Sequence, residues 1–416
     1  MAHPKISVWA SCLNPSEYLP YASSDLQAGL SYITSLEGDY PKTGFKAFQH
    51  AQLLMHGLKD YLLGREEIVE LYENHLSREL TKVDWSWIVQ DFTFFISKII
   101  AMETTQEDYT IDDATSDLFL SEEEFRDYLD LLNSEKNIIL QGPPGVGKTY
   151  IAKKLAHCLL NSRGNDRIEM IQFHQSYSYE DFVEGYRPTI GSTGEMTFEL
   201  QDGPIKRIAW DAALSWEIHK IRESDSPVDP YVLIIDEINR ANLSKVLGEL
   251  FYLLEYRDQS IQLQYSDKQF LLPPNLYIIG TMNTADRSIA TVDAALRRRF
   301  HFYPLFPDRP PVHGLLEPWM VQHNPAFTWI AKVVDKANEI LDDPNAAIGP
   351  SHFLKPGLDD ELVARIWNYT ILPYLEDYYL GDKDIRSEFA LDRLRLETAA
   401  GSPQATEVAE INRPIP

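Results

Sequence analysis

The sequence predicts an α/β fold in which helices cover both faces of a parallel sheet. Four short apolar runs have the length of buried strands, and helical segments separate them. Polar residues follow several of these runs directly, as at the ligand-binding edge of a parallel sheet. The runs are Asn137–Leu140, Met170–Phe173, Tyr231–Ile235 and Leu276–Gly280.

Length and composition indicate two or three packed domains. The chain has 416 residues, of which 44% are hydrophobic and 12% aromatic, which excludes a wholly disordered protein. The two cysteines, Cys12 and Cys158, exclude a disulfide framework or a cysteine-based metal site. We therefore expect a reducing, cytoplasmic location. With no apolar run of about 18 residues, we predict no membrane span.

The charge argues against a free-standing nucleic-acid binder, which normally has a basic patch. The net charge is -25, from 38 Lys+Arg and 63 Asp+Glu. It is -10 over residues 1–120, -7 over 121–304 and -8 over 305–416. Because the deficit is spread along the chain, DNA would have to follow a local groove or a path formed by a ring or a partner.

The N-terminal region, residues 1–100, is predicted to be a mostly helical domain. Apolar residues recur at helical spacing in Phe48–Leu63 and Trp85–Ile100. The aromatic residues after Trp85 could form a cage for a modified base, but their helical spacing favours an ordinary core. Residues 101–120 are acidic and polar, and we interpret them as a linker.

Residues 121–304 contain a complete phosphate-binding motif. Ser121 begins a helix, the strand Asn137–Leu140 follows, and a G-x-x-x-x-G-K-T motif then leads into the predicted helix Lys148–Leu160. Backbone N–H groups of such a loop face phosphate oxygens, the lysine approaches the β- and γ-phosphates, and the threonine hydroxyl binds Mg²⁺. The motif consists of Gly142, Pro143, Pro144, Gly145, Val146, Gly147, Lys148 and Thr149.

Two acidic residues follow the strand Tyr231–Ile235. At this edge of the sheet Asp236 would bind Mg²⁺, and Glu237 would act as general base toward the attacking water. Asn283 follows the next strand and can orient that water through its amide. Arg298 and Arg299, within a run of three arginines, are candidates for an arginine finger acting on a neighbouring subunit.

Two hairpins and a helical C-terminal region complete the predicted architecture. The hairpins are Met196–Ile205, turning at Asp202-Gly203, and Ile261–Leu272, turning at Ser266-Asp267. Beyond Tyr303 we predict no further strand. Residues 305–397 are predicted to be a helical domain, with helices over 325–345 and 358–380, and residues 398–416 a disordered tail.

The order of these motifs resembles the AAA+ superfamily over residues 121–380, and several stretches resemble its McrB family. The resemblance implies a P-loop AAA+ module with β-hairpin insertions and a C-terminal helical lid, to which the mostly helical N-terminal domain predicted above is added. It also implies that Asp286 and Arg287 belong to the nucleotide-binding strand end. The family-like stretches are Phe173–Pro188, Asp236–Asn242, Met282–Ser288 and Ile348–Phe353.

The resemblance implies a GTP-hydrolysing, Mg²⁺-dependent motor that forms a homo-oligomeric ring, usually a hexamer. It further implies a restriction system in which the ring moves DNA toward a separate McrC-like nuclease. Because the stretch Ile348–Phe353 departs from the family pattern, we assign no lid contact to Ser351 or His352. The DNA modification recognised does not carry over, since residues 1–120 do not resemble the modified-cytosine reader.

Three alternatives stay open. The chain could be an ATPase chaperone of the MoxR type, which shares the sequence Asp236–Ala241. It could also be a nucleotide-gated scaffold that needs binding but no hydrolysis. Finally, the aromatic residues of 173–188 are either core and interface packing or a loop facing the pore or the partner.

Overall fold

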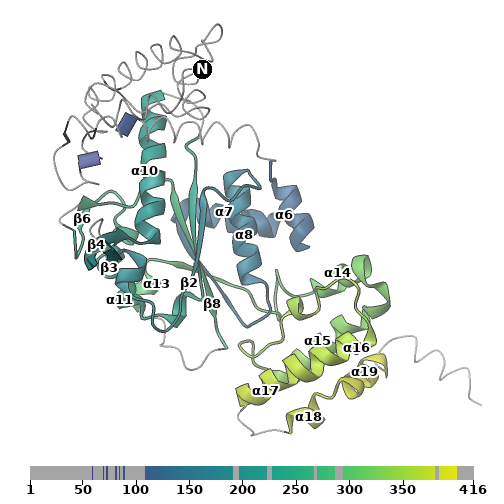
Figure 1. Cartoon of the computed structure of the whole chain (residues 1–416). Helices are drawn as coiled ribbons and strands as arrows, with labels where there is room; N and C mark the ends of the chain where they lie inside the picture. The colour runs from purple at the N-terminus through teal and green to yellow at the C-terminus, as the bar shows by residue number, and fades with distance from the viewer. Residues whose placement is uncertain are drawn as a thin grey trace, which may run out of the picture.

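The computed structural model describes residues 108–190, 196–222, 227–266, 269–285, 294–379 and 384–400, with isolated positions between 59 and 89 (Figure 1). Apart from Lys59, Ile88 and Val89, the predicted helices Phe48–Leu63 and Trp85–Ile100 lie outside the described residues, as do the aromatic residues after Trp85 and most of the predicted tail. The N-terminal helical domain therefore stays a prediction.

The centre of the described structure is a five-stranded sheet in the order β2-β5-β8-β1-β9. Every neighbouring pair is parallel. All five strands therefore end at the same edge. The strands are β1 (Asn137–Gly142), β2 (Ile168–Gln172), β5 (Tyr231–Asp236), β8 (Leu276–Asn283) and β9 (His301–Pro304).

Alternate strand residues contribute to two cores, one on each face of the sheet. In β1, Ile139 belongs to one core, whereas Ile138 and Leu140 belong to the other. Figure 1 shows α10 on one side of the strands and α7 and α8 on the other. The α-helices that contribute to the first core are α9 (Tyr179–Phe182), α10 (Pro204–Arg222), α11 (Leu243–Leu247), α12 (Leu250–Glu255) and α13 (Ala294–Arg297). Those of the second are α6 (Ile111–Leu118), α7 (Glu122–Glu135) and α8 (Lys148–Leu160).

Two antiparallel hairpins interrupt the α/β alternation. They are β3 (Glu184–Ile190) with β4 (Met196–Asp202), and β6 (Ile261–Gln262) with β7 (Gln269–Phe270). The second confirms the hairpin predicted over Ile261–Leu272. The first corrects a prediction, because Met196–Asp202 is the second strand of its hairpin and Gly203 precedes α10. A Cβ at Gly203 would lie 2.2 Å from the Phe182 carbonyl oxygen, so this glycine permits close approach instead of forming a turn.

A buried carboxylate joins the two hairpins. The fully buried side chain of Glu184 in β3 forms a 2.7 Å ion pair with Lys206 of α10. It also accepts hydrogen bonds from the backbone and hydroxyl of Ser266, between β6 and β7. These bonds hold the pKa of Glu184 below its usual value despite burial. The first hairpin, β3–β4, is therefore anchored to both α10 and the second hairpin.

The C-terminal region forms a helical lid with its own core, as predicted, in which Trp367, Phe353 and Phe389 are fully buried. Its α-helices are α14 (Leu316–His323), α15 (Trp329–Leu341), α16 (Asp360–Ile366), α17 (Leu372–Tyr379), α18 (Ile385–Glu388) and α19 (Leu391–Ala400). A π-helical turn, Trp367–Ile371, joins α16 to α17. Helix α19 continues to Ala400, two residues past the predicted start of the disordered tail.

Two further predictions need correction. Residues 111–118, inside the predicted linker, form α6, which the capping box of Thr110 and Asp113 begins and whose Ala114 and Leu118 are buried. Strand β9 was not predicted because it is short and its sequence, HFYP, is not an apolar run. It still pairs in parallel with β1, so the sheet has one strand more than the sequence indicated.

The aromatic residues of 173–188 pack mainly in the interior. Phe173, Tyr179 and Phe182 are at most 5% exposed and belong to the core on the α10 face. Tyr186, on β3, is 55% exposed. Core packing therefore accounts for most of this stretch, and Tyr186 is its exposed exception.

Candidate active site

The predicted phosphate loop lies where β1 ends and α8 begins. Gly145 and Gly147 adopt φ angles of +80° and +86°, which glycine tolerates best, and Gly147 directly precedes the first turn of α8. A Cβ at Gly142 would lie 2.0 Å from the carbonyl oxygen of Leu305. The backbone can therefore curl tightly at the helix N-terminus, where its N–H groups can bind phosphate oxygens.

Lys148 projects back across this loop. Its ammonium group donates to the carbonyl oxygens of Gly142 at 2.9 Å and Pro143 at 2.8 Å. Burial lowers the pKa of Lys148 to about 8, although the nearby charges of Glu237 and Asp236 act in the opposite direction. The Lys148 ammonium group is thus held over the phosphate loop, where an anionic ligand would stabilise its charged form.

Thr149 and Asp236 converge on one point. The Thr149 hydroxyl donates to Asp236 Oδ1 at 2.7 Å, across the edge of the sheet. A hydroxyl and a carboxylate are oxygen ligands suited to Mg²⁺, which is usually completed by substrate phosphates and water. No group of three or more His, Cys, Asp or Glu suited to a metal is found among the described residues. The pair therefore fits a Mg²⁺ shared with a nucleotide better than an all-protein metal cage.

Glu237 follows directly in an unusual backbone conformation. Its φ of +53° is rare for a residue with a side chain. Its backbone N–H donates to Thr281 Oγ1 at 3.1 Å, and its carboxylate lies 3.3 Å from Arg240 Nε. The chain turns sharply at Glu237, which directly follows Asp236, the last residue of β5. Glu237 therefore lies at the same sheet edge as the start of the phosphate loop.

Asn283 ends β8 at the level of the phosphate loop. It is the register partner of Gly142, and the next residue, Thr284, donates its N–H to the Gly142 carbonyl at 3.1 Å. The Asn283 carbonyl accepts from the Asn239 amide at 3.1 Å. The structure therefore places Asn283 beside the loop. Asp286 and Arg287 lie outside the described residues.

The arginine run lies at the opposite edge of the sheet. Asn137, the first residue of β1, donates its amide to the Arg299 carbonyl at 3.2 Å, whereas the phosphate loop follows the last residue of β1. Five residue steps of about 3.3 Å separate the two ends, about 17 Å in all. These arginines follow α13 (Ala294–Arg297).

Arg298 and Arg299 differ in their surroundings. The Arg299 guanidinium lies 3.0 Å from Glu255 and over the Phe251 ring, so it is tied to α12. Arg298 is exposed. Since neither residue is near the phosphate loop of its own chain, an exposed arginine here can reach a loop only on another subunit.

The lid contacts the phosphate loop through residues to which the sequence analysis gave no role. The Ser351 N–H donates to the Gly145 carbonyl at 2.8 Å, and the His352 ring lies 2.6 Å from where a Gly145 Cβ would be. Gly349 approaches so closely that a Cβ there would be 2.1 Å from the Gly145 carbonyl carbon. Ser351 and His352, to which we assigned no lid contact from the sequence, therefore do contact the phosphate loop. The resemblance of the stretch Ile348–Phe353 to the McrB family was the sequence feature that could have indicated this contact.

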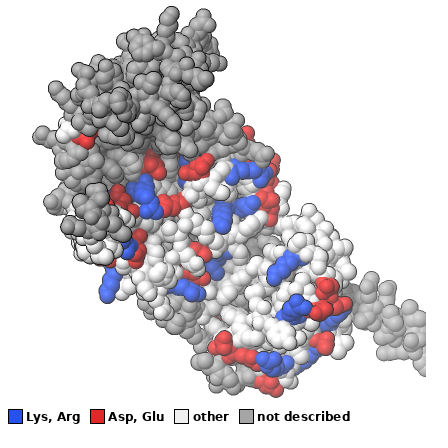
Figure 2. Space-filling model, viewed as in Figure 1, with Lys and Arg blue, Asp and Glu red and all other residues white. Residues whose placement is uncertain are grey.

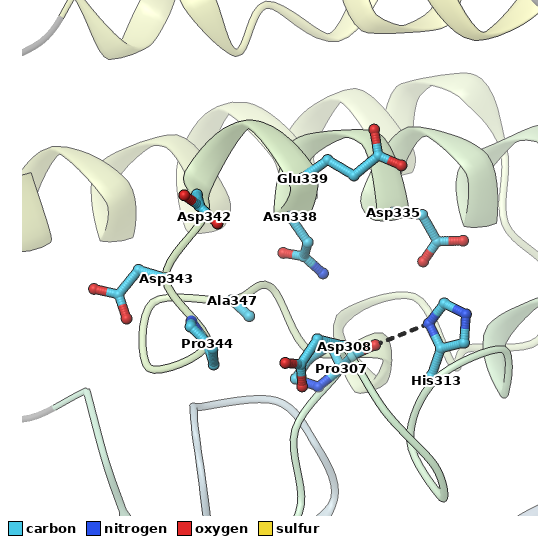
Figure 3. Close-up of a pocket in the computed structure, with 10 residues that line it drawn as sticks. All are labelled: Pro307, Asp308, His313, Asp335, Asn338, Glu339, Asp342, Asp343, Pro344 and Ala347. Atoms are coloured by element: carbon cyan, nitrogen blue, oxygen red, sulfur yellow. Dashed lines mark hydrogen bonds between the residues drawn. The ribbon is translucent and has the colours of Figure 1, made fainter.

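A cavity of about 280 Å³ lies between α15 and the segment after β9 (Figure 3). The segment begins two residues after Leu305, which contacts Gly142, and Ala347 on the other wall lies two residues before Gly349. Both walls thus continue directly into residues that touch the phosphate loop. Figure 3 shows Asp335 of α15 directed toward His313, whose ring is hydrogen-bonded to the Pro307 carbonyl at 3.1 Å.

The surface agrees with the acidic composition. On the face shown in Figure 2, the coloured Lys and Arg side chains are interspersed with Asp and Glu and form no continuous basic area. None of the helices in the described part of the chain has the length and apolar character needed to cross a membrane.

Comparisons with known proteins agree with this geometry. The AAA domain (dynein-related subfamily) model matches residues 137–300, and the McrB alpha-helical lid domain model matches residues 330–386. The chain is 38% identical to the type IV methyl-directed restriction enzyme EcoKMcrB subunit of Escherichia coli (strain K12), over 86% of this chain and 76% of that protein. It is 24% identical to the type II restriction enzyme BsuMI component YdiS of Bacillus subtilis (strain 168), over 68% and 90% respectively.

The parallel sheet, phosphate loop and helical lid define an AAA+ nucleotide hydrolase module. The chain belongs to the McrB family, which confirms the resemblance found in the sequence.

Proposed function

We propose that this chain is the motor subunit of a McrBC-like restriction system and that GTP is its preferred substrate. In this proposal it forms a homo-oligomeric ring, expected to be a hexamer, that moves DNA toward a McrC-like nuclease partner. One observation supports hydrolysis between subunits most strongly. Lys148, Thr149, Asp236, Glu237 and Asn283 lie at one sheet edge, whereas Arg298 is exposed at the other.

The site residues have distinct roles in the proposed reaction. Backbone N–H groups of the loop and Lys148 bind the phosphates, and Thr149 and Asp236 would hold Mg²⁺, which neutralises phosphate charge. Glu237 accepts a proton from the attacking water, whose oxygen bonds to the γ-phosphorus as the bond to the β–γ bridging oxygen breaks. Asn283 orients the water, and Arg298 of the next subunit stabilises the developing negative charge.

The cavity beside the loop supports guanine as the base. Its position allows it to receive the part of a nucleotide that extends away from the phosphates, and its lining is rich in carboxylates. Guanine presents two adjacent donor groups, N1–H and the N2 amino group, which a carboxylate accepts together. Adenine presents an unprotonated N1 acceptor instead and would meet the same carboxylate unfavourably.

Asp335 is the carboxylate that we assign to this discrimination. The substitution Asp335→Asn should reduce the ratio of GTP to ATP affinity about tenfold, since one charge-assisted pair is lost. Glu339→Gln is the matched control, because Glu339 is on the same helix and points away from His313 in Figure 3. An unchanged ratio of GTP to ATP affinity in Asp335→Asn would show that Asp335 in this cavity does not select the base.

The decisive experiment is hydrolysis by the purified chain with GTP and ATP in parallel, with and without a McrC-like partner and DNA. We expect GTP hydrolysis and nucleotide-dependent oligomers by mass photometry. Hydrolysis of ATP alone would contradict the GTPase proposal and favour the chaperone-like alternative. Function that survives in Glu237→Gln but not in Lys148→Ala would indicate a nucleotide-gated scaffold instead.

A further inference from the structure

One buried hydroxyl lies between the two acidic site residues. Thr281, in β8, is 1% exposed, and its side chain is enclosed at the sheet edge. Its Oγ1 donates to Asp236 Oδ1 at 2.5 Å and accepts the backbone N–H of Glu237 at 3.1 Å. A single hydroxyl thus uses both its donor and acceptor capacity on the two residues proposed to hold Mg²⁺ and to activate water.

Both hydrogen bonds of Thr281 constrain the geometry of the residues that they join. Asp236 Oδ1 accepts from Thr281 as well as from Thr149 at 2.7 Å, so two hydroxyls hold this carboxylate oxygen in place. Glu237 leaves the strand with φ of +53°, a conformation that persists only where its surroundings enforce it. The hydrogen bond from its N–H to Thr281 is one such constraint. Losing it would free the backbone that aims the Glu237 carboxylate.

We propose that Thr281 is a positioning residue for hydrolysis, which sets the metal-binding carboxylate and the general base together. This inference rests on the proposed roles of Asp236 and Glu237. Thr281 acts through these two residues and has no contact with substrate in this role. The hydroxyl is the essential group, since it makes both bonds.

The test compares Thr281→Val, which keeps the shape and removes the hydroxyl, with Thr281→Ser, which keeps the hydroxyl. We expect Thr281→Val to lower kcat about 10- to 100-fold and to lose most of the gain in nucleotide affinity that Mg²⁺ gives. Its affinity for GTP in EDTA should stay that of the wild type. Thr281→Ser should retain kcat and the Mg²⁺ gain within about threefold.

Three results would overturn the proposal: wild-type kcat and Mg²⁺ gain in Thr281→Val, equal impairment of Thr281→Ser, or weakened binding in EDTA alone. If thermal melting shows that Thr281→Val does not fold, Thr281→Cys replaces it, because its S–H group is a weak donor. Its kcat must then lie between those of Thr281→Ser and Thr281→Ala. In a Glu237→Gln background, Thr281→Val should add little to the loss of kcat. Wild-type hydrolysis by Glu237→Gln would refute the proposed function itself.

Discussion

The Thr149 hydroxyl donates a 2.7 Å hydrogen bond to Asp236 Oδ1, although the two residues lie 87 positions apart. The bond links the first turn of α8 to the end of β5. In the sheet, β8 lies between β5 and β1, the strand that leads into α8. The two oxygen atoms that we propose as Mg²⁺ ligands therefore lie close together in the fold itself. Such preorganisation lowers the cost of binding a cation with the nucleotide.

Removing the Asp236 charge should separate metal-assisted binding from simple phosphate binding. Asp236→Asn is expected to keep GTP affinity in EDTA but to lose most of the gain given by Mg²⁺, with hydrolysis reduced at least about 100-fold. Nucleotide titrations with and without Mg²⁺ measure both. Asp229→Asn, the same change at a partly buried ion pair with Arg167, is the control. Equal Mg²⁺ gains in the two variants would contradict the assignment.

Nucleotide binding should take up a proton in mildly alkaline solution. The pKa of Lys148 is lowered to about 8 in the free protein, so the side chain is mostly charged at pH 7 and mostly neutral at pH 9. Phosphate favours the charged form and raises this pKa. Affinity should therefore fall as pH rises above 8, by up to about tenfold per pH unit.

Calorimetry in two buffers of different ionisation enthalpy measures this proton. We expect uptake approaching one proton between pH 8.5 and 9, as about one group titrates, and little at pH 7. In Lys148→Arg, whose guanidinium stays charged, the uptake should vanish. Proton uptake that is equal in Lys148→Arg and the wild type would show that another group titrates.

The lid should lose its hold on the phosphate loop in Gly349→Ala. The new Cβ would lie 2.1 Å from the Gly145 backbone, and Gly349 has an ordinary φ of -75°, so steric overlap is the main effect. We expect nucleotide affinity to fall about 10-fold or more, with faster proteolysis between the domains. Ser351→Ala is a matched control, because Ser351 contacts Gly145 through its backbone N–H. If Gly349→Ala binds as tightly as Ser351→Ala, the contact has no role in binding.

Arg298 and Arg299 should differ in their effect on stability. Arg299→Ala removes the contacts with Glu255 and Phe251 and should cost about 1 kcal/mol, since the pair is partly exposed. Arg298→Ala should leave the Tm within about 1 °C, as exposed substitutions usually do. Differential scanning calorimetry of the two variants decides this. A lower Tm for Arg298→Ala than for Arg299→Ala would mean that Arg298, and not Arg299, is the arginine that stabilises the fold.

Part of this architecture could be predicted because single residues or short runs determine it. The apolar runs gave four of the sheet strands, and the G-x-x-x-x-G-K-T motif placed Lys148 and Thr149 at a helix start. The positions of the Asp-Glu pair at the end of β5 and of Asn283 at the end of β8 followed from the shared edge of parallel strands. These signals are local, so tertiary packing did not override them.

The missed features depend on contacts between distant residues. Gly203 resembled a turn residue, but the approach of the Phe182 carbonyl is what requires a glycine there. Helix α6 is specified by its capping box and two buried residues in place of a long apolar face. The contact of Ser351 with Gly145 and the double hydrogen bond of Thr281 need the folded sheet and lid.

The central claim is that one subunit's phosphate loop works with Arg298 of its neighbour. The direct measurement is GTP hydrolysis by Lys148→Ala and Arg298→Ala proteins, each alone and then mixed. Each alone should be inactive, because every site lacks either its lysine or its arginine. Mixed rings should regain activity at interfaces where an intact loop meets an intact Arg298 from the other variant. An inactive mixture in which mixed rings are demonstrated, or an active Arg298→Ala protein, would contradict the account.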